Sequence, residues 1–443
     1  MVVSAAVLVI VVLGVMAASD AVSGTAGANK ARTVAATLAE KDQEELRSLR
    51  TADLNQLSTY IPADRTVTVD GVAYTIHSEA VWVADMTGED ISCEVPEGDG
   101  SYLRISSTVS SPMSGARVKP VTMSSIVAPQ PGSGTLSAMV EDADDRPVVN
   151  MPVQASAVGL ATQTRKTNDA GCAVFSLLEA GSYDVKVDNA GWVDPEGNQL
   201  STQTATVNPG ILSTVEFVYD LAARINPANI VSRVNGTLQM DEGNGVLLAH
   251  SGLQTGFRTW PGSPTAAVFA PDKLFPFRDP YKIYAGQCTG ADPELYDGSY
   301  FEDNPTATPK LNRGENFGRI DVLEPATRLV VRRGTASSST TRSNARVYAY
   351  PTHASCSGQR IDMGATLSTP AGSVGTLMRP GLPFGDYRFC TQWTDTSFNP
   401  ARTWHVFPTT VVQNRIPTGA TALTTLLIPT SPSGGNGTCP ATA

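Results

Sequence analysis

Apolar residues are spaced in two ways along this chain, first in a continuous run and then at helical intervals. Residues 2–18 carry no charge, and a helix of that length is about 25 Å long, near the lower end of what crosses a bilayer. Residues 29–57 contain no Pro or Gly and are rich in good helix formers. Their larger apolar side chains fall broadly on one helical face: Val34, Leu38, Leu46, Leu49 and Leu57. The pattern predicts one long helix over residues 1–58.

After residue 62 the period changes from helical to alternating. In residues 66–76 (TVTVDGVAYTI), Asp70-Gly71 separates two alternating runs, which predicts a hairpin with a two-residue turn. Residues 79–85, 102–109 and 116–127 read as further strands. We therefore expect a small antiparallel sheet that covers the apolar face of the helix, and an N-terminal unit over residues 1–128.

The N-terminal run, MVVSAAVLVIVVLG, resembles type IV pilins and the related pseudopilins of type II secretion. Met1-Val2-Val3 matches the seventh to ninth positions of that pattern, so the peptidase-site Gly and the Glu at the fifth position are missing. This leads us to expect a true start upstream of Met1. The resemblance implies a helix that holds the subunit in the inner membrane and later packs in a filament core. Its membrane and filament residues would be Val2, Val3, Val7, Leu8, Val9, Ile10, Val11, Val12, Leu13 and Val15.

A Pro/Gly break at residues 128–134 (APQPGSG) ends this unit. The next stretch, 129–220, resembles the transthyretin-like β-sandwich of carboxypeptidase regulatory domains and of repeat modules in Gram-positive surface proteins. Its recognisable parts include a turn at Asp169-Ala170-Gly171 and a Gly181-x-Tyr183 step that opens a strand. The fold class we expect is an α+β pilin-like unit followed by all-β, Ig-like or transthyretin-like sandwiches in series.

An internal repeat supports the series of sandwiches. Asn150-x-x-Val153-x-Ala155 recurs as Asn344-x-x-Val347-x-Ala349, and Gly181-x-Tyr183 recurs as Gly385-x-Tyr387. We therefore predict a second copy over residues 326–430, a divergent sandwich over 221–325 between the two, and a flexible tail over 431–443.

Charge and cysteine content narrow the class of partner and the compartment. A formal net charge of −10 argues against nucleic acid as a partner. The six cysteines have no C-x-x-C spacing, so the sequence gives little support to a zinc site or a thioredoxin-like redox site. An even number of cysteines is compatible with disulfides formed outside the cytoplasm. We rank Cys356 and Cys390 as the first candidate pair, with other pairs or free thiols as alternatives. Cys439 is the residue that could pin the tail.

The sequence shows no catalytic, cofactor or metal motif. Four histidines stand apart, without a zinc-site spacing. Residues 292–303 gather five carboxylates, for which calcium binding is one interpretation and a solvated acidic loop the favoured one. Six aromatics could form a glycan platform but are more simply explained as core: Trp260, Phe269, Phe275, Phe277, Tyr281 and Tyr284.

The expected function is that of a non-enzymatic minor pilin or pseudopilin without cofactors. It would be a single-pass inner-membrane protein, with its bulk outside the cytoplasm and its sandwiches displayed after filament assembly. Its partners would be other pilin subunits, the inner-membrane assembly machinery, and a glycan or surface protein. The alternatives are a membrane-anchored adhesin or carbohydrate-binding protein outside any filament, and, more weakly, an enzyme on a sandwich scaffold.

Overall fold

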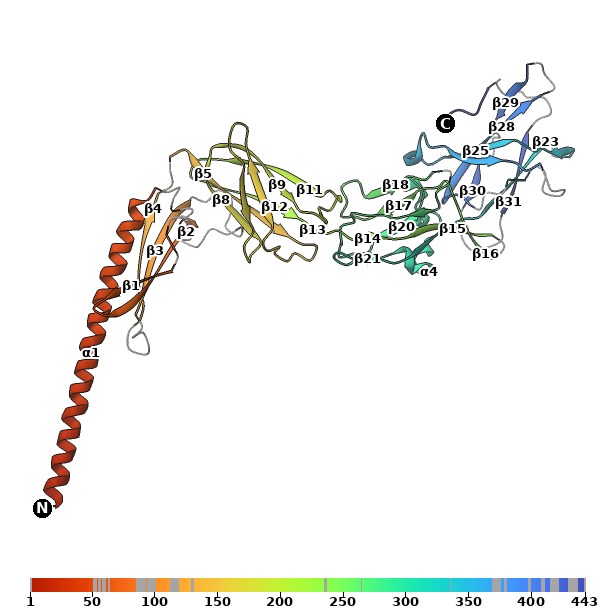
Figure 1. Cartoon of the computed structure of the whole chain (residues 1–443). Coiled ribbons are helices and arrows are strands. Elements are labelled where there is room, and N and C mark those ends of the chain that lie inside the picture. The colour runs from red at the N-terminus through yellow and green to blue at the C-terminus, as the bar shows by residue number, and fades with distance from the viewer. Residues whose placement is uncertain are drawn as a thin grey trace. The chain divides into compact units, whose positions relative to one another are not determined.

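The fold is described from a computed structural model of the chain (Figure 1). It describes residues 2–50, 54, 57, 61–62, 64–84, 93, 101–111, 119–128, 131–234, 237–263, 265–335, 337–368, 376–377, 381–396, 400–407, 411–414, 422–428 and 437–441. The side chains of residues 2–15 and 17–25 lie outside the description. The contacts divide the chain into two compact units, Met1–Asp188 with Ser201–Phe217, and Asn189–Leu200 with Val218–Ala443.

Unit 1 begins with helix α1 (Val2–Ser48) and an antiparallel sheet in the order β1-β2-β3-β4. Its strands are β1 (Asp64–Val69), β2 (Val72–Ala84), β3 (Ser101–Ser110) and β4 (Val121–Val127). The predicted hairpin is confirmed, with Val69 opposite Val72. Asp70 and Gly71 both have positive φ, 50° and 77°, the conformation that the primed turns of two-residue hairpins require.

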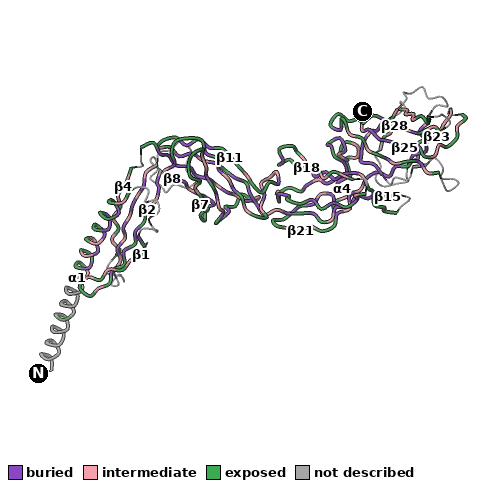
Figure 2. Tube along the Cα trace, turned by 45° about the horizontal axis from the view of Figure 1, so that its top comes forward, coloured by how far each residue is buried: buried purple, intermediate pink, exposed green. Residues whose placement is uncertain are grey.

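Helix α1 lies along the sheet (Figure 2), and small residues are buried where the two meet. Ala31, Ala35 and Ala39 are buried at intervals of four, and their short side chains let the helix approach the strands closely. The helix ends at Ser48, so the prediction that it continues through Leu57 is wrong. Leu46 and Leu57 nevertheless share one apolar cluster with Leu103 on the sheet.

The rest of unit 1 is a β-sandwich with the sheets β11-β9-β6-β7 and β12-β5-β8. The strands of the first sheet are β6 (Pro152–Ser156), β7 (Gln163–Lys166), β9 (Gly181–Asp188) and β11 (Leu200–Val207). Those of the second are β5 (Ser133–Glu141), β8 (Cys172–Glu179) and β12 (Leu212–Val218).

The fold class expected from the sequence is wrong in its first part. A helix and an antiparallel sheet are present, but they do not form an independent α+β pilin-like unit. Leu212 of the sandwich is buried in the same apolar cluster as Leu46 of the helix, and Cys93 between β2 and β3 is bonded to Cys172 of β8. Strands dominate the rest of the described chain.

Unit 2 opens with two short pairings, β10 with β13 and β14 with β21. Two sheets follow, β16-β15-β19 with β22 beside β15, and β18-β17-β20. The bounds are β10 (Trp192–Val193), β13 (Asp220–Leu221), β14 (Arg224–Ile225), β15 (Ala228–Val234), β16 (Thr237–Met240), β17 (Val246–Ala249), β18 (Phe257–Trp260), β19 (Val268–Phe269), β20 (Lys282–Ala285), β21 (Asn316–Phe317) and β22 (Ile320–Glu324).

The C-terminal part of unit 2 has the sheets β24-β23-β27, with β31 beside β23, and β26-β25-β28-β29, with β30 beside β28. The bounds are β23 (Thr327–Gly334), β24 (Ser339–Thr341), β25 (Arg346–Pro351), β26 (Ile361–Ala365), β27 (Thr376–Leu377), β28 (Gly385–Asp395), β29 (Arg402–Val406), β30 (Val412–Asn414) and β31 (Ala422–Ile428). Short helices connect the strands: η1 (Thr289–Ala291), η2 (Pro293–Leu295), α4 (Tyr300–Asp303), η3 (Pro305–Ala307) and η4 (Ala354–Cys356).

The predicted repeat between the first and last sandwiches is confirmed at one corner in each. Asn150 and Asn344 both have positive φ, 61° and 55°, just before β6 and β25. The amide of Asn150 donates to the carbonyl of Thr167 at 2.9 Å, and that of Asn344 to the carbonyl of Thr366 at 2.9 Å. Both threonine hydroxyls also receive an amide hydrogen bond, at 2.8 Å and 3.0 Å. The same local sequence therefore builds the same turn twice.

The Gly-x-Tyr element has the same hydrogen-bond geometry in both copies of the repeat. Tyr183 donates its hydroxyl to the carbonyl of Glu179 at 3.0 Å, and Tyr387 to that of Pro383 at 2.9 Å. Each tyrosine thus fastens the start of a central strand to the preceding turn, as a tyrosine corner does. The boundaries proposed for the individual sandwiches, and the divergent middle copy, stay predictions.

Candidate binding cleft at the Cys288–Cys356 junction

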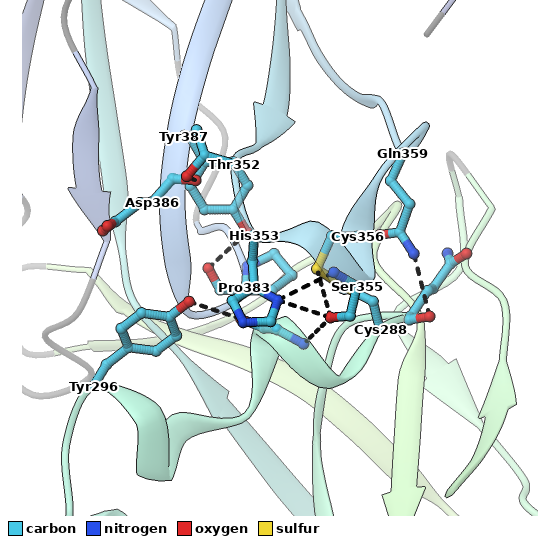
Figure 3. Close-up of a disulfide and its surroundings, with 12 residues drawn as sticks. Cys288, Tyr296, Thr352, His353, Ser355, Cys356, Gln359, Pro383, Asp386 and Tyr387 are labelled. Carbon is cyan, nitrogen blue, oxygen red and sulfur yellow. Dashed lines mark hydrogen bonds between the residues drawn. A yellow bond between two sulfur atoms is a disulfide. The ribbon is translucent and has the colours of Figure 1, made fainter. Parts of the chain in front are cut away.

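Two short loops interlock where the middle and last groups of strands in unit 2 meet (Figure 3). Cys288 follows β20 and precedes η1, and its disulfide partner Cys356 ends η4. Gly290 is required between them, because a Cβ there would lie 2.5 Å from His353 Nδ1 and 2.7 Å from Cys356 Sγ. A glycine at this position lets the loops approach to disulfide distance.

Hydrogen bonds cross the same junction. The Gly290 amide donates to Ser355 Oγ at 2.8 Å, and Gln359 Nε2 donates to the Gln287 carbonyl at 3.2 Å. Ser355 Oγ lies 2.9 Å from His353 Nδ1, and the Ser355 amide donates to that nitrogen at 3.3 Å. The junction is therefore held by polar contacts as well as by the covalent bond.

An aromatic pair packs beside the disulfide in the hydrophobic core of unit 2. The rings of Tyr300 and Phe384 meet edge to face, with centroids 5.1 Å apart, and both belong to one buried cluster with Cys288 and Cys356. Tyr300 donates its hydroxyl to the Leu323 carbonyl at 2.8 Å. Burial raises the pKa of Tyr300 above its ordinary value, so the phenol stays protonated and remains a donor.

A cleft with a volume of 980 Å³ opens beside the disulfide. Its lining includes the stretch from Met240 to Gly245 and strand β26 with Arg360 before it. The disulfide and Phe384 also line the cleft. The described lining residues include no His or Lys, and the two cysteines among them are bonded to each other.

Two charged residues of the cleft lining, Arg346 of β25 and Asp362 of β26, are paired with each other. Arg346 Nε lies 3.0 Å from Asp362 Oδ2. Burial of Asp362 opposes ionisation, but hydrogen bonds from Arg346 and the Gly364 amide outweigh it and leave the pKa of this carboxyl below its ordinary value. The guanidinium groups of Arg346 and Arg360 lie 5.8 Å and 4.6 Å from the centre of the Tyr348 ring.

Two buried carboxylates fasten the 240–245 stretch: Asp241, which belongs to it, and Glu324, which is bonded to its Asn244. Asn244 Nδ2 donates to Glu324 Oε2 at 2.8 Å and lies 3.5 Å from Asp241 Oδ2, and Ser232 Oγ lies 3.4 Å from Glu324 Oε1. Sequence reasoning missed this cluster because Glu324 is 80 residues from Asn244, and no local pattern connects them. These hydrogen bonds hold the 241–245 stretch of the cleft lining in place.

The predicted disulfide between Cys356 and Cys390 is wrong. Cys356 is bonded to Cys288, and Cys390 to Cys439, so each candidate is oxidised with another partner. Spacing along the sequence pointed to the nearer cysteine of the same sandwich, whereas the fold brings the loop after β20 and the C-terminal tail closer. Cys439 does pin the tail.

The aromatic set is core, as the favoured interpretation held. Phe275, Tyr281 and Tyr284 are at most 2% exposed, and the remaining members belong to the same cluster or pack against it. In the acidic stretch, Asp292 accepts from the Glu294 amide at 3.0 Å and Lys282 is paired with Glu294. Among the described residues no group of three His, Cys, Asp or Glu could hold a metal ion.

The four histidines lie in four separate places. His77 is paired with Asp64 on the first hairpin, at 2.9 Å. His250 stacks on Phe277 with ring centroids 3.8 Å apart, His353 lies at the disulfide junction, and His405 belongs to β29. The structure brings none of these described side chains together.

The expected membrane and filament residues, Val2 to Val15, belong to α1, but their side chains lie outside the described residues. Within the part of the chain that is described, no helix is both apolar and long enough to span a membrane. We therefore correct the expected single-pass placement in the inner membrane and the membrane contact that went with it.

No protein-family model and no curated protein matches the chain. Among solved structures, it is similar to the TIE protein of Bacillus anthracis, with 11% identity over 83% of this chain and 73% of the other, and a TM-score of 0.21. It is also similar to GBS52, a minor pilin of the Gram-positive pathogen Streptococcus agalactiae, with 13% identity over 43% and 95% and a TM-score of 0.21. A third is BcpA, the major pilin subunit of Bacillus cereus, with 9% identity over 68% and 100% and a TM-score of 0.20.

The family assignment made from the sequence is therefore wrong. The chain matches no type IV pilin, pseudopilin or carboxypeptidase regulatory family model. TM-scores near 0.2 are too low to define a fold or a function for this chain.

Proposed function

We propose that this chain is a non-enzymatic, extracellular structural subunit of a pilus-type or stalk-type surface assembly. In this role its sandwiches transmit force along the chain and present surfaces to partner proteins. The observation that carries the proposal is the placement of the disulfides, because two of the three connect successive parts of the fold.

The first of these bonds joins the small N-terminal sheet to the sandwich that follows it. Cys93 lies between β2 and β3, and Cys172 begins β8. The second joins the loop after β20 to η4, across the junction described above. A pull on the chain ends would meet a covalent bond at each of these places before the strands could separate. A disulfide that only stabilised a core would have no need to cross a junction.

The compartment and the chemistry of the cleft support the same proposal. All six cysteines are in disulfides, and disulfides persist mainly in oxidising compartments. The described lining of the cleft offers paired charges, amides and backbone groups, which favour binding of a partner over acid–base or nucleophilic catalysis.

Labelling of intact cells tests this function. An antibody raised against residues 129–220 should label the surface of unpermeabilised cells, and deletion of the gene should remove the label together with the appendage or the adhesion that depends on it. Label that appears only after permeabilisation would contradict the proposal.

A matched pair of variants tests the role of the junction bond. Limited proteolysis should cut the Cys288→Ser/Cys356→Ser variant between the two groups of strands in unit 2 faster than the parent chain. The Cys390→Ser/Cys439→Ser variant, which lacks a bond within the last sandwich, should be cut there no faster than the parent. Equal cutting in both variants would show that the junction does not depend on its disulfide.

A further inference from the structure

The C-terminal tail occupies a separate site on the outer face of the last sandwich. Along β25 the side chains alternate: Val347 and Ala349 belong to the sandwich core, while Tyr348 and Tyr350 point to the other face. There they form a small cluster with Cys390 and with Cys439 of the tail. The described part of the tail therefore packs on the outer face of a sheet to which it contributes no strand.

The contacts that hold the tail are mostly to its backbone. Tyr350 donates its hydroxyl to the Pro440 carbonyl at 2.6 Å, and Arg360 Nη1 donates to the same oxygen at 3.1 Å. The Cys439 amide donates to Gln392 Oε1 at 2.9 Å, and the Gly437 amide to the Thr403 carbonyl at 2.9 Å. We call Tyr348, Tyr350, Arg360, Cys390, Gln392 and Thr403 the tail site.

The segment that connects the last strand to the tail is rich in Pro, Ser and Gly. Strand β31 ends at Ile428 and pairs with β23, in the other sheet of the sandwich. Residues 429–436, PTSPSGGN, join it to the tail, and eight residues span at most about 28 Å. No described backbone pairing within a sheet includes the tail, so it can leave the site without breaking a strand ladder.

From these contacts we propose that the tail site also receives the tail of a second copy, and that neighbouring copies become linked through Cys390 of one and Cys439 of the other. This inference rests on the proposed function, since it supplies a link between subunits of one assembly. A tail from a second copy makes the same contacts as the chain's own tail. The choice between them therefore depends only on local concentration.

Formation of the Cys390–Cys439 bond, within or between copies, removes two protons and two electrons from the two thiols. A disulfide oxidant of the extracellular compartment takes these up and is reduced to two thiols. With an effective concentration of about 1 mM for a short tether, about half of the tails should be exchanged at 1 mM protein and about one in a thousand at 1 µM.

Isotope mixing measures the exchange directly. Equal amounts of unlabelled and ¹⁵N-labelled full chain are reoxidised together in a glutathione redox buffer, digested, and analysed for peptides joined by disulfides. At about 1 mM, about a quarter of the Cys390–Cys439 links should join a heavy to a light peptide, and at 1 µM almost none should. The Cys288–Cys356 links serve as an internal control and should stay unmixed. Absence of mixed Cys390–Cys439 links at both concentrations would overturn the inference.

A complementary pair of variants avoids reduction and refolding. Full-length Cys390→Ser and Cys439→Ser chains cannot form the bond within a copy, but together they can form it between copies. Their mixture should give a dimer on a non-reducing gel, with Cys439 of one variant joined to Cys390 of the other. A mixture that gives no more dimer than either variant alone would contradict the proposal. This result is independent of where the protein is located on the cell, so it can fail while the proposed function stands.

A synthetic peptide of residues 435–443, GNGTCPATA, tests recognition by the site. It should form a mixed disulfide with Cys390 in the Cys439→Ser chain, and the Tyr350→Phe and Arg360→Gln substitutions should each slow its capture several-fold, because each removes a donor to the Pro440 carbonyl. Capture at equal rates in all three backgrounds would show that the site does not recognise the tail.

Discussion

Replacement of Asp42 by alanine should separate α1 from its sheet. Asp42 is 2% exposed on the sheet-facing side of the helix. Its Oδ2 accepts from the hydroxyls of Ser78, at 2.8 Å, and Ser107, while its Oδ1 contacts the Arg65 guanidinium. Removal of the carboxylate leaves two buried hydroxyls and a half-buried cation without this partner. Loss of one member of a buried ion pair costs about 3–5 kcal/mol.

Hydrogen exchange of peptides from α1, β2 and β3 measures this cost. At 1.36 kcal/mol per tenfold change, protection in Asp42→Ala should fall roughly a hundred- to several-thousand-fold. The control is Glu45→Ala, one turn along the helix, because Glu45 lies 3.5 Å from the same guanidinium but its side chain is 55% exposed. An exposed pair contributes at most about 1 kcal/mol, so protection should fall less than about tenfold in the control. A loss below tenfold in Asp42→Ala, or equal losses in both variants, would refute this reasoning.

Three further predictions concern the junction, a histidine and the repeated corner. Gly290→Ala should destabilise unit 2 by about 1–3 kcal/mol through overpacking. The control is Gly298→Ala, whose added Cβ meets nothing within 4 Å and should leave the stability unchanged. Urea unfolding measures the free energy of unfolding of both variants. Burial lowers the pKa of His250, so the stabilisation by its neutral ring is present above the ordinary histidine pKa and is lost as the pH falls through the lowered one. Urea midpoints between pH 7.5 and pH 5 should therefore fall less in His250→Gln than in the parent chain, and an equal fall would contradict the assignment. Thr167→Val and Thr366→Val each remove the same pair of hydrogen bonds and should each cost about 1–3 kcal/mol; clearly unequal losses in thermal unfolding would argue against equivalent corners.

Local sequence signals predicted those turns whose conformation is determined by one or two residues. The Asp70-Gly71 hairpin and the corners at Asn150 and Asn344 each depend on positive φ at one or two residues, and the amino-acid preference for that conformation is strong. The end of α1 was misplaced because Leu57 keeps the helical spacing and is buried in the same cluster as Leu46, although the helix stops at Ser48.

The candidate site could not be predicted because its residues meet only after folding. Cys288 and Cys356 are separated by 68 residues and Cys390 and Cys439 by 49, and spacing alone does not distinguish these pairs from others. The cleft depends on the close approach of two groups of strands, for which Gly290 is the local requirement. The sequence around an isolated loop glycine does not indicate which distant segment will pack against it.

Single-molecule extension of the full chain tests most directly whether the disulfides make this protein a mechanical element. In the oxidised chain, the segments enclosed by Cys93–Cys172 and Cys288–Cys356, with sequence separations of 79 and 68, should stay hidden when the folded parts unfold. A reductant should then add about 270 Å and about 240 Å of contour length from these two segments, at about 3.5 Å per residue. It should add about 170 Å more from the segment enclosed by Cys390–Cys439, whose sequence separation is 49, and it should lower the force at which the flanking parts separate. Equal extension and equal force with and without reductant would contradict the account.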